Sequence, residues 1–492
     1  MADLLLGVDA GQTVTKTVLF DVEGTVRASG STRVPVHTPA PRWVERDMDE
    51  VWQATASAIR ACLHTAGVPA TRVAAVGVVG HNDGLYPVDA AGRPVRAAVT
   101  AMDSRAHEVL AGWRQGPVWP QALRLTGQVP FAASPAAVLA WFAQHEPSVL
   151  DRSRWFLFCK DWLKLRLTGE VSTDPSEASA SFTDVHTQGY APAALELYGL
   201  AGYADRLPPI LPSTSVAGGV TAAAAAATGL ALGTPVVSGA HDVDAAALGM
   251  GAVDVGALSL VAGTFSINQV VSADVRVDQR WQARSFVEPR RWLNMSTSPA
   301  SATNLEWFLR THGGAGDYLR VEQEVAESLT GPSSVLYLPF LYGSPHGEQA
   351  SGAFVGLRGW HGRGHVLRAL LEGVVLNHRT HVTALRSRFT VAPQVALSGG
   401  ASRSALWSQL FADALRLPVV VPRCAETGAH GAALLAGIGA GLYPDVASAA
   451  RVVQVARRHV PDPARADVLD AAYAAYLDAV EGLAPVWAGL AR

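Results

Sequence analysis

The chain has 492 residues, of which 49% are hydrophobic and 16% charged, and its formal net charge at pH 7 is −3. This composition excludes a disordered chain, and the length favours two domains. Lys and Arg are scattered and no apolar run reaches about 18 residues, so we expect neither a nucleic-acid surface nor membrane association. The first residues lack the basic segment of a signal peptide, and three widely spaced cysteines favour reduced thiols in a cytoplasmic protein.

The first predicted element is a strand at residues 4–8, followed by Asp9-Ala10-Gly11-Gln12-Thr13 and a second strand at 17–20. Small polar residues at the tip of such a hairpin expose backbone N–H groups, and Lys16 lies close by. Both features suit a phosphate. An ordinary hairpin is the alternative, because a single Asp-x-Gly is weak evidence.

A helix is expected at residues 50–66, and a strand at 73–79 runs into Gly80-His81-Asn82-Asp83-Gly84. Three polar side chains between glycines at a strand end can bind the hydroxyls of a polyol. A plain turn is the alternative, since Asn and Asp are common in turns. Further on, Asp103 and Arg105 either pair with each other or reach a ligand.

The middle of the first half is expected to be helical in pieces from residue 141 to 167. Residues 173–176 are expected to form a turn or a helix cap. The alanine run at 222–227 favours a short helix that Gly229 ends.

A buried strand at residues 235–237 leads into Ser238-Gly239-Ala240-His241-Asp242, and an Ala-rich helix follows. The N-terminus of a helix stabilises a carboxylate, so Asp242 is a candidate general base. The alternative is that Asp242 or Asp244 caps the helix, which is a common role for Asp at such a turn.

The second half begins as the first does, with a strand at 258–261, a turn at Gly263-Thr264 and a strand at 267–271. This repetition suggests two related domains that face a shared cleft. Later, a strand at 395–397 runs into Gly399-Gly400, and a helix follows from 405 to 415. A Gly-Gly turn before a helix lets a nucleotide approach the backbone closely.

Residues 426–433 are expected to begin another helix with small side chains. Such a surface suits either a flat adenine ring or close packing against another helix. Close packing is the expectation for Gly431 and Ala432.

In order, these motifs resemble those of the FGGY carbohydrate kinases over nearly the whole chain. The resemblance rests on Gly7–Thr13 with Lys16, the Trp43-Val44-Glu45 segment, Asp242 seven residues before Gly249, Gly263-Thr264, the signature-like 352–372, Gly399-Gly400 and 426–433.

The resemblance implies an α/β protein with two actin-like (ribonuclease H-like) domains around a central cleft. We place the N-terminal domain, with the sugar site and the base, at residues 1–250, and the C-terminal domain, with the nucleotide site, at 251–492. The implied cofactors are ATP and Mg²⁺, the implied partner is a small sugar or polyol, and a homodimer is left open.

The resemblance also assigns roles to residues. Asp242 is the catalytic base and Asp9 belongs to the metal and phosphate region. The substrate set is His81, Asn82, Asp83, Asp103, Arg105 and Asp242. The nucleotide set is Gly11, Gln12, Thr13, Lys16, Gly263, Thr264, Gly399, Gly400 and Ser404.

Some positions depart from the family pattern. Gln12 stands where many members have Thr, and Ala101 where an aromatic residue often lines the sugar site. Residues 343–347 look like those of L-xylulose kinases, whereas 159–163 and 173–177 look as much like those of erythritol kinases. A pentulose kinase of the xylulose type is the first expectation and an erythritol kinase the second.

Two other functional classes make different predictions. A different actin-like ATPase would not need the polar set at 81–83 or a base at Asp242. A non-catalytic sugar sensor on a kinase fold would be expected to lose Asp9 or Asp242, and both are present.

Overall fold

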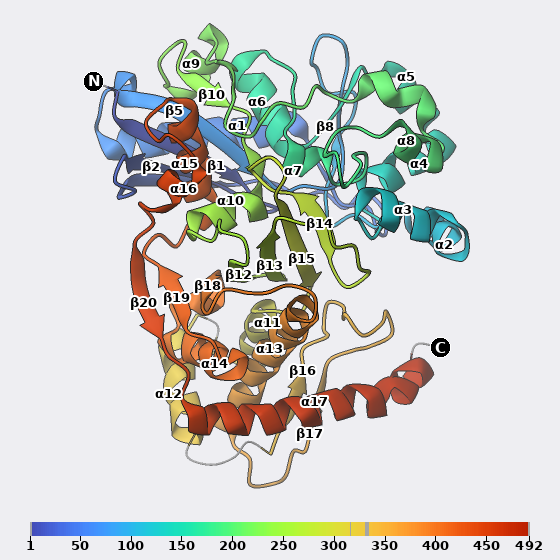
Figure 1. Ribbon diagram of the computed structural model, residues 1–492, viewed down its shortest axis with the longest axis vertical. Coiled ribbons are helices and arrows are strands. Elements are labelled where there is room, and N and C mark those ends of the chain that lie inside the picture. Colours follow the sequence, from blue (N-terminus) through green and yellow to red (C-terminus); the bar gives the residue numbers. More distant parts are fainter. Residues whose placement is uncertain (1, 315, 330–333, 491–492) are drawn as a thin grey trace. The chain divides into compact units, whose positions relative to one another are not determined.

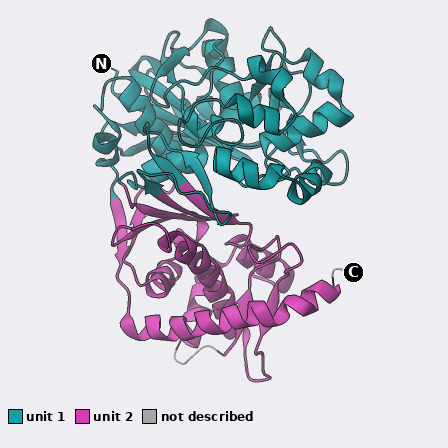
Figure 2. Ribbon diagram, turned by 45° about the vertical axis from the view of Figure 1, so that its right-hand side comes forward, with its two compact units in different colours: residues 1–254, 271–293, 426–454 teal, residues 255–270, 294–425, 455–492 magenta. Residues whose placement is uncertain are grey.

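The structure is a computed structural model that describes residues 2–314, 316–329 and 334–490 (Figure 1). The chain forms two compact units, each built from three chain segments (Figure 2). Unit 1 contains residues 1–254, 271–293 and 426–454. Unit 2 contains residues 255–270, 294–425 and 455–492.

The main sheet of unit 1 has the strand order β3-β2-β1-β5-β10-β9, and β11 also pairs with β5. Strands β1 and β2 form an antiparallel hairpin, whereas β1, β10 and β11 all run parallel to β5. Strand β1 reads Leu-Leu-Leu-Gly-Val-Asp-Ala and is buried almost throughout, as expected for a central strand covered on both faces.

The strands of unit 1 are β1 (Leu4–Ala10), β2 (Val14–Asp21), β3 (Val26–Arg33), β4 (Glu45–Arg46), β5 (Val73–Gly80), β6 (Tyr86–Val88), β7 (Ala98–Val99), β8 (Trp155–Leu157), β9 (Val216–Gly219), β10 (Pro235–Val237), β11 (Ala240–His241) and β14 (Gln282–Ser285). Its helices are α1 (Met48–Ala66), α2 (His107–Gln115), α3 (Val118–Thr126), α4 (Pro135–His145), α5 (Pro147–Arg152), α6 (Cys159–Thr168), α7 (Pro175–Ala178), α8 (Pro192–Leu197), α9 (Ala222–Thr228), α10 (Asp242–Gly249), α15 (Thr427–Gly439) and α16 (Val446–Ala450).

Helix α15 packs directly on the central strands of unit 1, although it comes from the last part of the chain (Figure 1). A β-carbon at Gly7 or Gly77 would overlap the backbone of Ala429 or Ala432, and one at Gly431 would overlap the backbone of α10. The expected close packing of Gly431 is therefore present. Small residues let these backbones approach more closely than larger side chains would allow.

The second main sheet has the strand order β14-β15-β13-β12-β18-β19-β20, and most of its strands belong to unit 2. It repeats the arrangement that opens unit 1, because β12 and β13 form an antiparallel hairpin and β18 runs parallel to β12. The boundary between the two units crosses β13 and β15.

The strands of this part of the chain are β12 (Leu258–Ala262), β13 (Ser266–Ser272), β15 (Trp292–Ser298), β16 (Leu336–Leu338), β17 (Ala353–Val355), β18 (Val395–Ser398), β19 (Val419–Pro422) and β20 (Val455–His459). The helices are α11 (Thr303–His312), α12 (Tyr318–Ser328), α13 (Arg363–Arg386), α14 (Ala405–Leu415) and α17 (Pro463–Leu490).

Most predicted elements lie where they were expected, but the stretch 141–167 contains a strand between its helices. Strand β8 pairs antiparallel with β6, more than 60 residues earlier in the chain. The helical periodicity of a short stretch of sequence carries no information about a strand partner so far away in the chain. The run at 222–227 is helical, and Gly229 ends it in the left-handed conformation with φ 77°.

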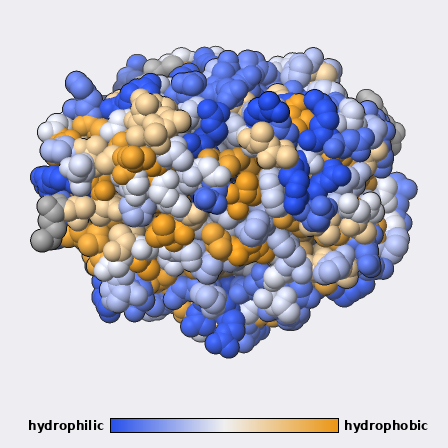
Figure 3. Space-filling view, turned by 90° about the horizontal axis from the view of Figure 1, so that it is seen from above, coloured by the Kyte–Doolittle hydropathy of each residue, from blue (hydrophilic) through white to orange (hydrophobic). Residues whose placement is uncertain are grey.

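On the face drawn in Figure 3, hydrophilic and hydrophobic residues are interspersed, as is usual on globular surfaces. Across the described parts of the chain, every helix is too short or too polar to span a membrane.

Candidate active site

The parallel strands of unit 1 bring several of the predicted residues to one edge of the sheet. Ala10 of β1 and His241 of β11 both lie opposite Gly80 of β5. Asp9, His81 and Asp242 are therefore grouped near the carboxyl ends of adjacent strands, where open α/β sheets bind their ligands.

Asp242 is the first residue of α10, at the strand-to-helix turn that the sequence predicted. The N-cap residue is His241, and no side chain makes a capping hydrogen bond there. The Asp242 side chain is 29% exposed, while that of Asp244 is fully buried. The carboxylate with access to a ligand is thus that of Asp242.

His241 lies between these two carboxylates. Its Nε2 is 3.1 Å from Oδ1 of Asp242 and its Nδ1 is 3.3 Å from Oδ2 of Asp244. Burial alone would lower the pKa of His241, but its contacts with Asp242 and Asp244 outweigh burial and raise the pKa to about 10. The imidazole is therefore charged at neutral pH.

Asp9 is a half-buried carboxyl close to the charge of Asp242. Burial, followed by the charge of Asp242, raises the pKa of Asp9 to about 7, and Lys16 acts in the opposite direction. The backbone of Gly428, at the start of α15, lies so close that a β-carbon there would overlap the Asp9 carboxylate. Lys16 forms an ion pair with Glu426 at 2.6 Å.

These groups fit a magnesium ion that arrives with a nucleotide. Among the residues that the structure describes, no three His, Cys, Asp or Glu side chains form a metal site by themselves. Mg²⁺ is commonly held by one or two carboxylates together with phosphate oxygens and water. Asp9 supplies a carboxylate of this kind, and it is drawn towards its charged form by any nearby cation.

The run His81-Asn82-Asp83 is buried, and Asp83 adopts φ 64°. Burial, followed by the charge of Arg46, lowers the pKa of His81 to about 3, so this imidazole is neutral. Asp83 forms an ion pair with Arg284 of β14 at 3.2 Å, and Nε of Arg284 donates to Oε1 of Gln128. Nη1 of Arg284 is buried and makes no hydrogen bond with any described residue.

Asp103 and Arg105 pair with each other, which is one of the two possibilities that the sequence left open. Nη2 of Arg105 is 2.8 Å from Oδ2 of Asp103 and 2.7 Å from Oε1 of Glu45. The guanidinium also lies 4.1 Å from the ring centroid of Trp43. The pair thus links to the Trp-Val-Glu segment, and its role in substrate binding stays a prediction.

A buried ionic cluster supports the strand-to-helix turn. Nζ of Lys160 lies 2.6 Å from Asp161 and 3.0 Å from Asp174, and Nζ of Lys164 donates to the carbonyl of Ser238 at 3.4 Å. The backbone N–H of His241 donates to Oγ of Ser176 at 2.9 Å. The residues around Asp242 are therefore fixed by hydrogen bonds from two helices, α6 and α7.

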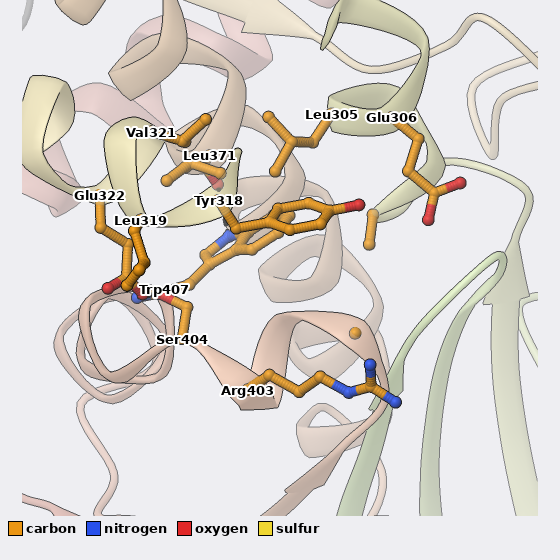
Figure 4. A pocket seen from close by; sticks show the side chains of 12 residues that line it. Leu305, Glu306, Tyr318, Leu319, Val321, Glu322, Leu371, Arg403, Ser404 and Trp407 are labelled. Atoms are coloured by element: carbon orange, nitrogen blue, oxygen red, sulfur yellow. Dashed lines mark hydrogen bonds between the residues drawn. The ribbon is translucent and has the colours of Figure 1, made fainter. Parts of the chain in front are cut away.

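Unit 2 contains a separate pocket of about 300 Å³ beside the Gly-Gly turn (Figure 4). Gly400 and Ser404 both line it, and the rings of Tyr318 and Trp407 form much of its wall. The remaining lining residues are Ala302, Leu305, Glu306, Leu319, Val321, Glu322, Leu371 and Arg403. A pocket with an apolar wall and a few polar groups suits a flat heterocycle attached to a polar group.

The predicted turn at Gly263-Thr264 connects β12 to β13 within unit 2. The carbonyl of Gly263 accepts a hydrogen bond from the N–H of Ala302 at 2.9 Å, and the carbonyl of Thr264 accepts one from Oγ1 of Thr303. The start of α11 thereby holds the turn, and its role in phosphate binding stays a prediction.

Comparison with known proteins identifies the class to which this fold and site belong. The N-terminal domain of the FGGY family of carbohydrate kinases matches residues 4–249, and the C-terminal domain of that family matches residues 258–440. These matches cover most of the chain and define a carbohydrate kinase. The chain belongs to the FGGY family.

Individual relatives support this assignment. The chain is 33% identical over 456 residues to the L-xylulose/3-keto-L-gulonate kinase of Escherichia coli, covering 92% of this chain and 91% of that protein. It is 30% identical over 517 residues to the erythritol kinase of Brucella abortus, covering 99% and 98%. The crystal structure of xylulose kinase from Rhodospirillum rubrum is 29% identical and matches with a TM-score of 0.88, covering 98% and 99%.

These findings confirm the predicted family and the predicted α/β class with an actin-like fold. FGGY sugar kinases use ATP, and their substrates are small sugars or polyols.

Several residues at the site were not found from the sequence. Arg284 and Gln128 lie outside the recognised motifs, and only the fold brings them to Asp83. His241 and Arg46 stand beside recognised motifs, but nothing in their spacing indicates that His241 contacts Asp242 or that the charge of Arg46 acts on His81. Adjacency to a candidate base was the one available signal, and it pointed to His241.

Proposed function

We propose that this protein transfers the γ-phosphoryl group of ATP to a terminal hydroxyl of a small open-chain sugar or polyol. An L-xylulose-type pentulose is the first candidate substrate and erythritol the second. The observation that carries the proposal is the partly exposed carboxylate of Asp242, which lies at the edge of a sheet among buried polar side chains.

In the proposed reaction, Asp242 takes the proton of the attacking hydroxyl. The hydroxyl oxygen forms a bond to the γ-phosphorus, the bond from that phosphorus to the β–γ bridging oxygen breaks, and ADP leaves. A positioned general base contributes about 10²–10⁴-fold in rate. Phosphoryl transfer otherwise depends mainly on positioning and on neutralising charge.

The chain's other residues would bind and orient the reactants. His81, Asn82 and Asp83 would hydrogen-bond the hydroxyls of the substrate. The turn at 11–13 with Lys16, and the turn at Gly263-Thr264, would bind phosphates, while Gly400 and Ser404 would lie against the nucleoside. Mg²⁺ bound with ATP near Asp9 would supply positive charge to the phosphate oxygens.

The substrate class is supported by the character of the buried groups. Buried hydrogen-bonding groups reject analogues that leave them unpaired more strongly than apolar walls reject a missing methylene. Relatives named for L-xylulose and erythritol are consistent with a four- or five-carbon substrate. The name of one relative also includes 3-keto-L-gulonate, a six-carbon open-chain acid, which is a separate candidate outside this size range because Arg284 provides a buried cation next to Asp83.

The test is a kinetic series with ATP and purified protein over glycerol, erythritol, D-xylulose, L-xylulose, L-ribulose, fructose and 3-keto-L-gulonate. We expect the highest kcat/KM on L-xylulose and the next highest on erythritol. A best substrate of three carbons, or a hexose such as fructose, would contradict the proposed substrate class. Absence of phosphorylation of every compound would contradict the proposed function.

The role of Asp242 is tested by Asp242→Asn, which keeps the shape of the side chain but cannot accept the proton. We expect kcat to fall at least about 100-fold while ATP still binds. The matched control is Asp254→Asn, which removes an exposed carboxylate just beyond the same helix and should leave kcat unchanged. Near-normal turnover by a folded Asp242→Asn variant would remove Asp242 from the catalytic role.

A further inference from the structure

The arrangement around His241 carries an inference that rests on the proposed function. His241 contacts one partly exposed carboxylate, that of Asp242, and one fully buried carboxylate, that of Asp244. Both oxygens of Asp244 are buried, and the polar contact that they make with His241 is the ion pair to Nδ1 at 3.3 Å. A buried carboxylate with so few polar contacts is costly, so the charge that faces it must compensate.

We propose that His241 and Asp244 are positioning residues for the reaction, in which a charged imidazole, anchored by Asp244, holds the carboxylate of Asp242 in one orientation towards the attacking hydroxyl. Neither residue contacts the reacting atoms. From the sequence, a helix cap was the alternative role for Asp244. In the structure its side chain makes no capping hydrogen bond and faces His241 instead.

Each ring nitrogen has a separate role in this arrangement. Nδ1 lies against Asp244 and fixes the rotation of the ring, while Nε2 lies against Asp242. The backbone of His241 is also held, because its N–H donates to Oγ of Ser176, which in turn donates to Asp174. The ring therefore has little freedom to turn away from Asp242.

The charges that face His241 come from every element packed around it. Asp242 and Asp244 belong to α10, Glu177 to α7, Arg284 to β14, and His81 follows β5. Burial raises the pKa of Glu177 well above its usual value, which favours the neutral form of this carboxyl, and His81 is neutral. The charge of Arg284 lowers the pKa of His241. Asp242 and Asp244 raise that pKa and therefore stabilise the charged imidazole.

His241 and Asp244 are both charged over the physiological range of pH. Burial raises the pKa of Asp244 to about 6, against the opposing effect of His241, while the pKa of His241 is raised to about 10. Between these values both groups are charged. A histidine with a raised pKa loses its proton, and its contribution to the site, as the pH rises through that pKa.

The experiment compares Asp244→Asn with wild type in kcat, KM and pH profile on the best substrate. We expect kcat to fall about tenfold or more and KM for sugar and ATP to change less than about twofold. This loss is smaller than that for the base itself, which is worth about 10²–10⁴-fold. The alkaline limb of the kcat profile should move to lower pH by one unit or more, because His241 loses one of its two anionic partners.

Two further variants distinguish a positioning role in the reaction from a purely structural role. Asp244→Glu keeps the anion and should recover part of kcat and the position of the alkaline limb. His241→Gln keeps a hydrogen-bond donor without the charge and should lower kcat with no alkaline limb near pH 10. Unchanged kcat and an unmoved alkaline limb in a folded Asp244→Asn variant would overturn the proposal.

A second measurement reports the protonation state of His241 directly in the wild type and does not depend on the activity of a variant. In ¹⁵N-labelled histidine spectra at pH 8.5 we expect an imidazolium signal that persists, and His241→Gln assigns it by its loss. A wild-type spectrum with no imidazolium signal at pH 8.5 would overturn the proposal. If wild type phosphorylates no sugar while this signal persists, the proposed function fails and the charged pair stands. If the wild type is active but His241 is neutral, the proposed function stands and the positioning role of a charged His241 fails.

Discussion

Asp83 occupies a backbone conformation that few residues other than glycine adopt. Its φ of 64° lies in the left-handed region, where Asn and Asp are the most tolerant of the remaining residues. Strained residues of this kind persist where the surrounding structure fixes them, and they cluster at functional sites. Here the surrounding structure includes Arg284, whose buried charge would lose its ion-pair partner if Asp83 were removed.

This pairing leads to a prediction about substrate charge. Asp83→Asn should lower kcat/KM for L-xylulose, because the unpaired Arg284 would no longer be held in place for neutral hydroxyls. It should raise kcat/KM for 3-keto-L-gulonate relative to L-xylulose by about tenfold, since a substrate carboxylate can pair with the freed guanidinium. The measurement is the ratio of the two kcat/KM values in variant and wild type.

The control for this experiment is Asp89→Asn, which removes a half-buried carboxylate just after β6 that pairs with Arg93 rather than with Arg284, and it should not alter the ratio. An unchanged ratio in a folded Asp83→Asn variant would show that Arg284 does not face the substrate.

At the scale of elements, the two glycines of the turn before α14 have different structural roles. Gly399 has φ 90°, and a β-carbon there would lie 2.6 Å from the backbone of Ala262. Gly400 has room for a β-carbon, because its nearest neighbours would be 3.8 and 3.9 Å away. Gly399 is thus required by the turn, whereas Gly400 leaves the pocket of unit 2 open on that side.

Gly400→Val is therefore expected to raise KM for ATP about tenfold or more, with Tm and the KM for sugar little changed. The added side chain would occupy space in the pocket that Tyr318 and Trp407 line. Gly399→Ala should instead lower the free energy of unfolding by roughly 1–3 kcal/mol, the cost of a strained backbone conformation. Titration with ATP and thermal unfolding of both variants provide the comparison, and an unaltered ATP titration of Gly400→Val would place the nucleotide elsewhere.

Elements that depend on local signals could be predicted from the sequence. The turn at Asp242, the helix that ends at Gly229 and the hairpin at the start of each half have apolar runs bounded by glycine or aspartate. Strand β8 could not be predicted, because it exists only through its pairing with β6. The same holds for the site: Asp242 has a local signal, whereas Arg284 reaches Asp83 across 201 residues of chain.

At the scale of the whole molecule, each unit depends on chain segments that are far apart in the sequence. The last segment of unit 1, at 426–454, supplies α15, which packs on β1, β5 and α10. The glycines along these contacts leave no space for a different helix in that position. The core of unit 1 is therefore incomplete in any fragment that ends before α15.

A fragment of residues 1–254 should therefore fail to fold as a compact protein. We expect it to bind an apolar dye, to aggregate at micromolar concentration and to lack a cooperative thermal transition, because the surface under α15 is exposed. The full chain, expressed and purified in the same way, is the control. A monomeric fragment with a cooperative transition would show that α15 is dispensable to the core of unit 1.

The late position of α15 has a consequence for synthesis in the cell. Strands β1 and β5 are synthesised within the first 80 residues, but the helix that covers them begins at Thr427. At about 5–20 residues per second, the nascent chain exposes this apolar surface for tens of seconds. During that interval we expect a chaperone to bind the exposed apolar surface. We also expect the yield of active protein to depend on how quickly the last part of the message is translated.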